Sequence, residues 1–224
     1  RLSRSGHGET MRQEDPAIPR SYAQPAKVRE KASRQEISIE LTRKSIHLLI
    51  ALVPLLFSLS RALTLLLLSG GIIGYSIFET LRMKGYSIPI ISAVTARAAR
   101  LRDSGRFVTG PVTLGLGALL VLILFPQGPA SVAIYILAFA DGLSSLVGKT
   151  IGRIRLPLTR GKSLEGSITC FICSFLPSYM ISGRVGASLV IAFVSTLVEA
   201  APTKDWDNIL LPLAAGATAM VLGI

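Results

Sequence analysis

A carboxylate and several cations stand close together in the segment AFADGLSSLVGKTIGR, residues 138–153. Most of this segment is apolar or small, yet it carries Asp141 and, further along, Lys149. On a helix the two residues would be roughly 12 Å apart along the axis. Ionisable side chains at membrane depth are costly and usually functional. If this segment spans a membrane, Asp141 predicts a functional site beneath a basic opening.

The small and polar residues of this segment share one face of the expected helix. They recur at i, i+3, i+4, i+7, i+8 and i+11, and are Asp141, Ser144, Ser145, Gly148, Lys149 and Gly152. Such a stripe is expected to line a cavity or a helix contact. Close packing through the G-x-x-x-G of Gly148 and Gly152 is the alternative, and it needs no chemistry. Packing alone does not account for Asp141.

The connection RLPLTRGKSLEGS, residues 155–167, carries a second group of polar residues. Arg160, Lys162 and Ser163 can donate hydrogen bonds to phosphate, and Glu165 can bind a metal ion or a cation. The G-K-S sequence lacks the first glycine of a Walker A loop. The segment predicts a phosphate-binding loop. Cations that serve only to orient the chain in a membrane are the alternative.

An apolar stretch near the start of the chain is preceded by ELTRKSIHLLI. Here Glu40, Arg43, Lys44 and His47 recur at helical spacing, so one helical face carries four ionisable groups toward the membrane. A lone histidine would indicate little. The shared face predicts a contribution to the same site.

The segment VEAAPTKDWDNILLPL near the C-terminus gathers further oxygen donors. It supplies Glu199, Asp205, Asp207 and Asn208, which could together hold a hard divalent cation. A solvated loop is the alternative. Glu79 and Arg82 form one more opposed pair, for which a salt bridge is the simpler interpretation.

Apolar segments must position these residues. Half of the 224 residues are hydrophobic and the mean hydropathy is +0.55. A soluble domain of this size could not bury so much apolar sequence, and a membrane-spanning helix needs roughly 20 residues. The expected spans are residues 46–60, 62–78, 108–125, 129–148, 167–182, 184–200 and 208–224. The sequence therefore predicts an all-α, polytopic integral membrane bundle with about seven transmembrane helices.

The formal net charge of +11 is distributed unevenly over this topology. All but two of the 24 Lys and Arg residues fall on one side, and the exceptions are Arg61 and Arg184. The positive-inside rule then places the N-terminus and the polar clusters at the cytoplasmic face. The basicity is thereby explained without nucleic acid as a partner. The protein is expected to be multi-pass, with its active site facing the cytoplasm.

Residues 1–35 are polar, contain three prolines and show no apolar periodicity. This composition predicts a mobile basic tail before a membrane-embedded domain at residues 36–224. Cys170 and Cys173 form a C-x-x-C within an expected span, without a second pair in the chain. They are interpreted as apolar core residues.

Carboxylates beside clustered cations at one membrane face are suited to phosphoryl transfer, which depends on positioning and charge neutralisation. From about Glu40 to the C-terminus the motifs also resemble the polyprenol kinase family, which includes dolichol kinase, phytol kinase and the CTP-dependent diacylglycerol kinases. The motifs are ELTRKSIH, ADGLSSLVGKTIGR, KSLEGS and DNILLPL, in this order. The chain resembles the short form of that family.

The resemblance implies a lipid kinase domain at residues 36–224. Such a kinase moves the gamma phosphate of CTP or ATP, with Mg²⁺, onto a long-chain alcohol, a prenyl alcohol or diacylglycerol in the bilayer. Nucleotide binding is expected of Arg43, Lys44, Gly148, Lys149, Gly152, Arg153, Lys162, Ser163 and Gly166. Metal binding is expected of Asp141, Glu165, Asp207 and Asn208. Catalytic roles are expected of His47, Asp141, Lys149, Lys162 and Glu165, with a carboxylate or His47 orienting the lipid hydroxyl.

Two other classes of protein stay open at this point. A CTP:phosphatidate cytidylyltransferase would use the same nucleotide, although the long acidic and histidine-bearing C-terminal signature associated with that enzyme is absent. A small transporter could use Asp141 and the basic opening as an anion pathway, although the paired repeats common in transporters are not seen. The acceptor alcohol and the oligomeric state are not determined by the sequence.

Overall fold

The computed structural model describes residues 39–86, 106–157, 159, 161–201 and 206–224. The tail expected at residues 1–35 lies outside the described residues, as do Arg160 and Asp205. Within the described ranges the chain is helical apart from turns, short connections and one isolated antiparallel bridge between Arg155 and Ser163.

Two long spans are built from several consecutive helical pieces. Residues 39–49 are helical and continue through the 3₁₀ turn η2 into α2, which gives one span, Ile39–Leu59. The π-helical segment η4 joins α6 to α7 in the span Gln127–Thr150. The elements are η2 (Ile50–Leu52), α2 (Val53–Leu59), α3 (Arg61–Met83), α5 (Gly110–Leu124), α6 (Gln127–Tyr135), η4 (Ile136–Asp141), α7 (Gly142–Thr150), α8 (Leu164–Ser182), α9 (Val185–Ala200) and α10 (Asp207–Val221).

Each of the seven predicted spans falls on a helix in the structure. Four helices in the described residues are long and apolar enough to cross a membrane: Ile39–Leu59, Arg61–Met83, Gln127–Thr150 and Leu164–Ser182. Gly110–Leu124, Val185–Ala200 and Asp207–Val221 are shorter apolar helices. The predicted all-α, polytopic helical membrane bundle is confirmed.

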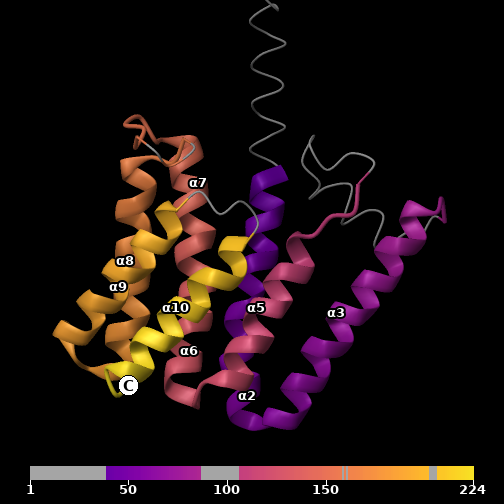
Figure 1. Cartoon of the computed structure of the whole chain (residues 1–224), viewed down its shortest axis with the longest axis horizontal. Coiled ribbons are helices and arrows are strands. Elements are labelled where there is room, and N and C mark those ends of the chain that lie inside the picture. The colour runs from indigo at the N-terminus through magenta and orange to yellow at the C-terminus, as the bar shows by residue number, and fades with distance from the viewer. Residues whose placement is uncertain (1–38, 87–105, 158, 160, 202–205) are drawn as a thin grey trace, which may run out of the picture.

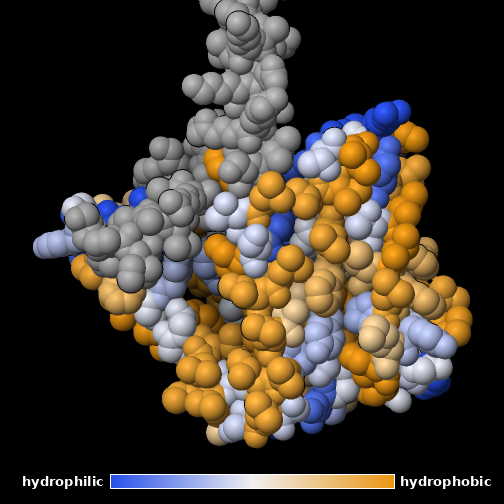
Figure 2. Space-filling view, turned by 180° about the vertical axis from the view of Figure 1, so that it is seen from behind, coloured by the Kyte–Doolittle hydropathy of each residue, from blue (hydrophilic) through white to orange (hydrophobic). Residues whose placement is uncertain are grey.

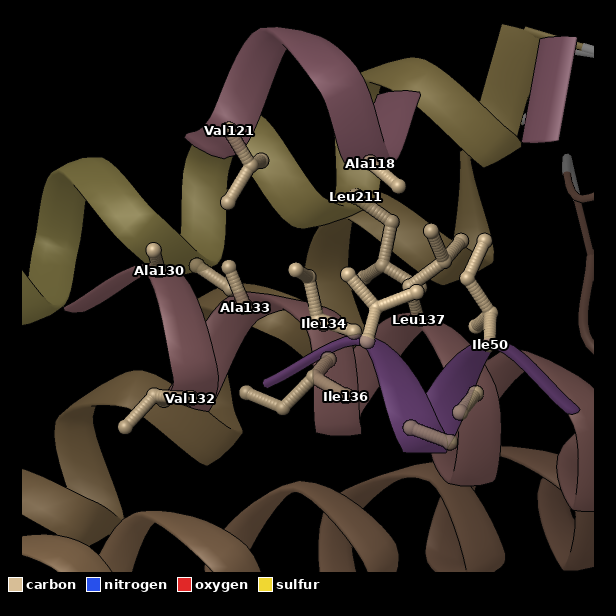
Figure 3. Packing of buried hydrophobic residues seen from close by; sticks show 14 of the residues in the cluster. Ile50, Ala118, Val121, Ala130, Val132, Ala133, Ile134, Ile136, Leu137 and Leu211 are labelled. Carbon is tan, nitrogen blue, oxygen red and sulfur yellow. The ribbon is translucent and has the colours of Figure 1, made fainter. Parts of the chain in front are cut away.

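The span Gln127–Thr150 forms the centre of the bundle. In its most apolar stretch 61% of the residues are buried, against 11% for α3 at the edge. α10 packs on α5, α6 and α9, α8 packs on α7 and α9, and α3 packs along α5 and α2 (Figure 1). Alanines on the central span allow this close approach, and Figure 3 shows Ile134 and Leu137 together with Leu211 of α10.

Large apolar side chains cover the outside of the bundle. Figure 2 shows them over most of the face seen from behind. Leu66 on α3, Met180 on α8 and Val221 on α10 are 70%, 83% and 85% exposed. Continuous apolar surface of this kind would be unfavourable in water, and it fits contact with lipid.

Short turns join the helices at one end of the bundle. Ser60 alone separates α2 from α3, and its side chain accepts a hydrogen bond from the backbone N of Leu63. Gly183 ends α8 in the left-handed conformation, with φ 65°, shortly before α9 begins. At the other end of the bundle, predicted site residues of distant segments come together.

Candidate active site

A polar cavity of about 280 Å³ opens at the end of the bundle opposite the short turns at Ser60 and Gly183. Six parts of the chain contribute to it: residues 39–49, the end of η4 with α7, the connection before α8, the first turn of α8, the end of α9 and the start of α10. It is lined by Arg43, Lys44, Asp141, Ser144, Ser145, Gly148, Lys149, Arg155, Gly161, Lys162, Ser163, Gly166, Ser167, Glu199, Asp207 and Asn208.

Asp141 lies at the inner wall and is held by two residues of the first span. Lys44 Nζ is 2.8 Å from Asp141 Oδ2 and also donates to the Asp141 carbonyl oxygen at 3.0 Å. His47 Nδ1 lies 3.2 Å from the same Oδ2. All three side chains are buried. The charge of the buried carboxylate is therefore compensated by the ammonium of Lys44, which is far away in the sequence.

The backbone near Asp141 departs from regular α-helix. Residues Ile136–Asp141 form a π-helical segment, a rare arrangement that is frequent at functional sites. It ends at Asp141 and is followed by α7, whose Ser144 and Ser145 line the cavity. The stripe of small and polar residues predicted on this helix therefore faces the cavity through Asp141, Ser144, Ser145, Gly148 and Lys149.

Lys149 at the end of α7 is paired with Glu40 of the first span. Lys149 Nζ lies 2.5 Å from Glu40 Oε2, and Ser145 Oγ donates to Glu40 Oε1 at 2.9 Å. The Glu40 side chain is 3% exposed, whereas that of Lys149 is 48% exposed. The lysine therefore extends from a buried partner to the cavity opening, where a ligand could contact it.

Lys162 forms the third ion pair of the cavity, with Glu199 at the end of α9. Lys162 Nζ lies 2.7 Å from Glu199 Oε1 and also donates to the Glu199 carbonyl oxygen. A cation at a helix C-terminus interacts favourably with the helix dipole. Glu199 Oε2 is buried without a hydrogen-bond partner, so this carboxylate retains acceptor capacity in the cavity.

The N-terminus of α8 also faces the cavity. Ser163 caps the helix by accepting a hydrogen bond from the backbone N of Gly166 at 3.1 Å, and Gly166 and Ser167 line the wall. The positive end of the helix dipole favours an anion such as phosphate at this N-terminus. Lys162, directly before the cap, adds a full positive charge.

Glycines bring α7 and α8 into close contact beside the cavity. A Cβ at Gly152 would lie 2.3 Å from the carbonyl oxygen of Gly148, and a Cβ at Gly166 would lie 2.9 Å from that of Ser144. A Cβ at Gly148 would meet Ser163 Oγ at 3.0 Å. The packing interpretation of these glycines therefore holds alongside the polar lining of the cavity.

Asp207 and Asn208 enter the cavity from the start of α10. Asn208 Nδ2 donates to Thr113 Oγ1 of α5 at 2.9 Å, and Asp207 Oδ1 accepts from the backbone N of Asn208 at 3.1 Å. Asn208 is buried, and its hydrogen bond to Thr113 holds the start of α10 against α5. This contact keeps the side-chain oxygens of Asp207 and Asn208 at the cavity wall.

The oxygen donors of the cavity suit a Mg²⁺ ion that is also bound by a nucleotide. Within the part of the chain that the structure describes, no three His, Cys, Asp or Glu side chains are close enough to hold a metal ion. Asp141, Asp207 and Asn208 nevertheless line one space, and Glu199 has an unpartnered oxygen there. Mg²⁺ commonly binds one or two carboxylates together with substrate phosphates and water. This donor set suits a metal ion that shares its ligands with a nucleotide.

The structure does not bring every predicted site residue into the cavity. Glu165 accepts hydrogen bonds from the backbone N of Arg153 at 2.9 Å and of Ile154 at 3.3 Å, and so orders the connection between α7 and α8. Arg153 is exposed and, like Gly152, lies outside the cavity lining. His47 also lies outside that lining, and reaches it through its contact with Asp141.

Arg155 lines the cavity although the sequence did not mark it out. Its Nη1 donates to the Gly161 carbonyl oxygen at 2.8 Å. Arg155 is paired with Ser163 in the isolated bridge, so the connection turns back on itself there. Helical spacing could not have revealed this residue, because α7 has ended at Thr150.

A separate ionic cluster fixes the start of α5 to α3. Glu79 accepts from Arg82 at 2.7 and 2.8 Å, and from the backbone N of Val108 at 2.9 Å. Tyr75 Oη donates to the Val108 carbonyl oxygen at 3.0 Å. The predicted Glu79–Arg82 salt bridge is thus present, and it has a positional role.

Fold and site together define a multi-pass helical membrane protein with a basic, carboxylate-containing cavity at one end. Comparison with known proteins shows which proteins this sequence is similar to. The sequence is 31% identical to a probable chloroplastic phytol kinase 2 of Glycine max over 119 residues, which cover 46% of this chain and 41% of that protein. It is 30% identical to probable phytol kinase 1 of the same plant over 159 residues, or 62% and 52% of the two chains.

A longer alignment, with probable phytol kinase 3 of Glycine max, has 29% identity over 203 residues, or 82% of this chain and 63% of that protein. The chain is therefore related to the polyprenol and phytol kinase family, as its motifs indicated. It spans about half the length of the curated relatives it matches. No family model matches the sequence, and no solved structure is a significant match.

Proposed function

We propose that the protein is a membrane lipid-alcohol kinase. It transfers the gamma phosphate of a nucleoside triphosphate, with CTP favoured over ATP, to the hydroxyl of a prenyl alcohol, another long-chain alcohol or diacylglycerol. The reaction depends on Mg²⁺ and takes place at the cytoplasmic membrane face. The relatives named as phytol kinases support the kinase activity and the alcohol acceptor, and the positive-inside distribution of Lys and Arg supports the cytoplasmic face. CTP and Mg²⁺ are carried over from the resemblance of the motifs to the polyprenol kinase family.

The single observation that carries the proposal is the set of three lysine–carboxylate pairs around one cavity. Lys44 is paired with Asp141, Lys149 with Glu40 and Lys162 with Glu199. Phosphoryl transfer requires cations on the phosphate oxygens and carboxylates for the metal ion and for positioning. A triphosphate would supply new partners for the lysines, and a bound Mg²⁺ would be a new partner for Asp141.

Individual residues then have definable roles. Lys149 is the most exposed of the three lysines, and it makes the first contact with the incoming phosphates. Lys162 and the positive end of the α8 helix dipole hold the transferred phosphoryl group by charge. Asp141, Asp207 and Asn208 would hold Mg²⁺, which neutralises phosphate charge when bound.

The chemical step is a displacement at the gamma phosphorus. The alcohol oxygen forms a bond to that phosphorus while the bond to the bridging oxygen of the leaving nucleoside diphosphate breaks. The hydroxyl proton passes to the His47 imidazole, whose Nδ1 lies 3.2 Å from Asp141 Oδ2. The products are the lipid monophosphate and the nucleoside diphosphate, so atoms and charge balance.

The proposal is tested with the purified full chain in detergent micelles. Gamma-labelled CTP or ATP is supplied with Mg²⁺ and with phytol, a series of prenols or diacylglycerol. The expected result is a labelled lipid monophosphate, which identifies donor and acceptor together. Asp141→Asn, purified in parallel, controls for a contaminating kinase. The proposal would be overturned in favour of a cytidylyltransferase by two results together: no combination of nucleotide and alcohol gives a labelled lipid, and a CDP-lipid forms when phosphatidate is supplied.

A further inference from the structure

A second, smaller cavity lies next to the first, between residues 39–49 and the start of α5. Its volume is about 30 Å³. It is lined by Arg43, Ile46, His47, Gly110, Pro111 and Leu114. Arg43 lines both cavities, so the two spaces adjoin at this side chain.

His47 connects the two cavities chemically. Its ring forms part of the wall of the small cavity, and its Nδ1 lies 3.2 Å from Asp141 Oδ2 in the wall of the large one. The side chain is 4% exposed, so bulk water does not reach most of the ring. A group in the small cavity would therefore face the imidazole, while a group in the large cavity would face the carboxylate.

The rest of the small cavity is apolar. Ile46, Pro111 and Leu114 contribute hydrocarbon, and Gly110 contributes no side chain. A single water molecule needs roughly 10–15 Å³ of such volume, so a cavity about twice that size has room for the CH₂–OH end of an alcohol. An apolar wall with two basic residues at one side matches a primary alcohol attached to a hydrocarbon chain.

We propose that this small cavity is the acceptor subsite, and that the lipid hydroxyl binds there against His47 while its hydrocarbon chain passes between residues 39–49 and α5 into the bilayer. The assignment rests on the proposed kinase activity. Arg43 then lies between acceptor and donor, where it can contact the phosphate of the product. Glu79 accepts a hydrogen bond from the backbone N of Val108, which fixes the segment just before Gly110 and Pro111 and so stabilises this wall of the subsite.

Gly110 provides a way to fill the subsite without disturbing the packing. Gly110 lines the small cavity and a Cβ there would meet nothing within 4 Å, so Gly110→Leu is designed to place a side chain in this space. Gly74 on α3 is the matched control, because a Cβ there also meets nothing within 4 Å and the residue lines neither cavity. Both substitutions replace a helical glycine by leucine.

The steady-state constants for alcohol and nucleotide are measured separately in both variants. Gly110→Leu should raise the KM for the alcohol by about tenfold or more, while the KM for the nucleotide and the thermal midpoint stay close to those of Gly74→Leu. An unchanged KM for the alcohol in Gly110→Leu, in a protein that still phosphorylates lipid, would overturn the subsite and leave the kinase function intact.

Photocrosslinking gives a second measurement that needs no turnover. A long-chain alcohol with a diazirine near its hydroxyl should label Ile46 or Leu114, and unlabelled alcohol should compete. Competed labelling at these residues without any phosphoryl transfer would support an alcohol site and contradict the kinase function. Labelling confined to other helices in an active protein would contradict the subsite alone.

Discussion

Lys44 and Asp141 are separated by 97 positions in the sequence, yet Lys44 Nζ lies 2.8 Å from Asp141 Oδ2 inside the bundle. The lysine also donates to the Asp141 carbonyl oxygen at the end of the π-helical segment. Each side chain is only 6% exposed. A buried pair of this kind contributes little net stability while intact, but loss of one partner leaves an uncompensated charge.

This relationship separates the structural role of the pair from its catalytic role. Lys44→Met should lower the free energy of unfolding by about 3–5 kcal/mol, because Asp141 is left as an unpaired buried charge. The double variant Lys44→Met with Asp141→Asn removes that charge, so it should recover much of the stability while activity stays lost. Thermal or denaturant unfolding in detergent and label transfer are measured on the wild type, on Lys44→Met, on Asp141→Asn and on the double variant. If the loss of unfolding free energy in the double variant equals the sum of the losses in the two single variants, the two residues do not interact.

The Lys149–Glu40 pair predicts opposite effects of two substitutions on nucleotide binding. Lys149→Met removes a donor to phosphate, and should weaken nucleotide binding by about 10- to 100-fold, the range of a charge-assisted hydrogen bond. Glu40→Gln removes the competing carboxylate charge while its amide oxygen can still accept from Ser145, so nucleotide binding should stay the same or become tighter.

Equilibrium binding of a fluorescent nucleotide checks both variants, and circular dichroism in the same detergent confirms that each is folded. Equal weakening in the two proteins would mean that the pair acts only as a structural link between the first span and α7.

Magnesium and nucleotide should bind interdependently. Within the described residues no acidic cluster can hold a metal ion alone, so Mg²⁺ without nucleotide should show no saturable binding at concentrations that support activity. Removal of Mg²⁺ with EDTA should abolish phosphoryl transfer and weaken nucleotide binding about fivefold or more, and the nucleotide must favour Mg²⁺ by the same factor. Calorimetric titrations of each ligand, with and without the other, measure this coupling. Tight binding of Mg²⁺ to the nucleotide-free protein would contradict the assignment.

The sequence predicted the bundle well because its signal is local. Apolar stretches of sufficient length and the one-sided distribution of cations need no knowledge of packing. The polar faces around Lys44 and Lys149 also lie on regular helices, so helical spacing placed them in the cavity. The connection after α7 was harder, because its conformation depends on the Arg155–Ser163 bridge and on Glu165 binding backbone N–H groups. Neither feature has a periodic signature in the sequence. The sequence motifs therefore indicated Arg153, whereas in the structure Arg155 lines the cavity.

The close contact between α7 and α8 predicts that Gly152 tolerates no side chain. A Cβ at this position would lie 2.5 Å from Ser163 Oγ as well as too close to the Gly148 carbonyl oxygen. Gly152→Ala should therefore displace the α8 cap, lower the thermal midpoint and reduce phosphoryl transfer. Gly71→Ala on α3 is the control, because a Cβ there meets nothing within 4 Å. Equal midpoints for the two variants would contradict the close packing.

The central claim is that this cavity transfers the terminal phosphate, and not the nucleotide, to a lipid alcohol. The most direct measurement supplies the purified protein and its alcohol with gamma-labelled CTP in one reaction and alpha-labelled CTP in the other. The account predicts labelled lipid from the gamma label alone, and none with Asp141→Asn. Label from the alpha position in the lipid product would show nucleotidyl transfer and contradict the account.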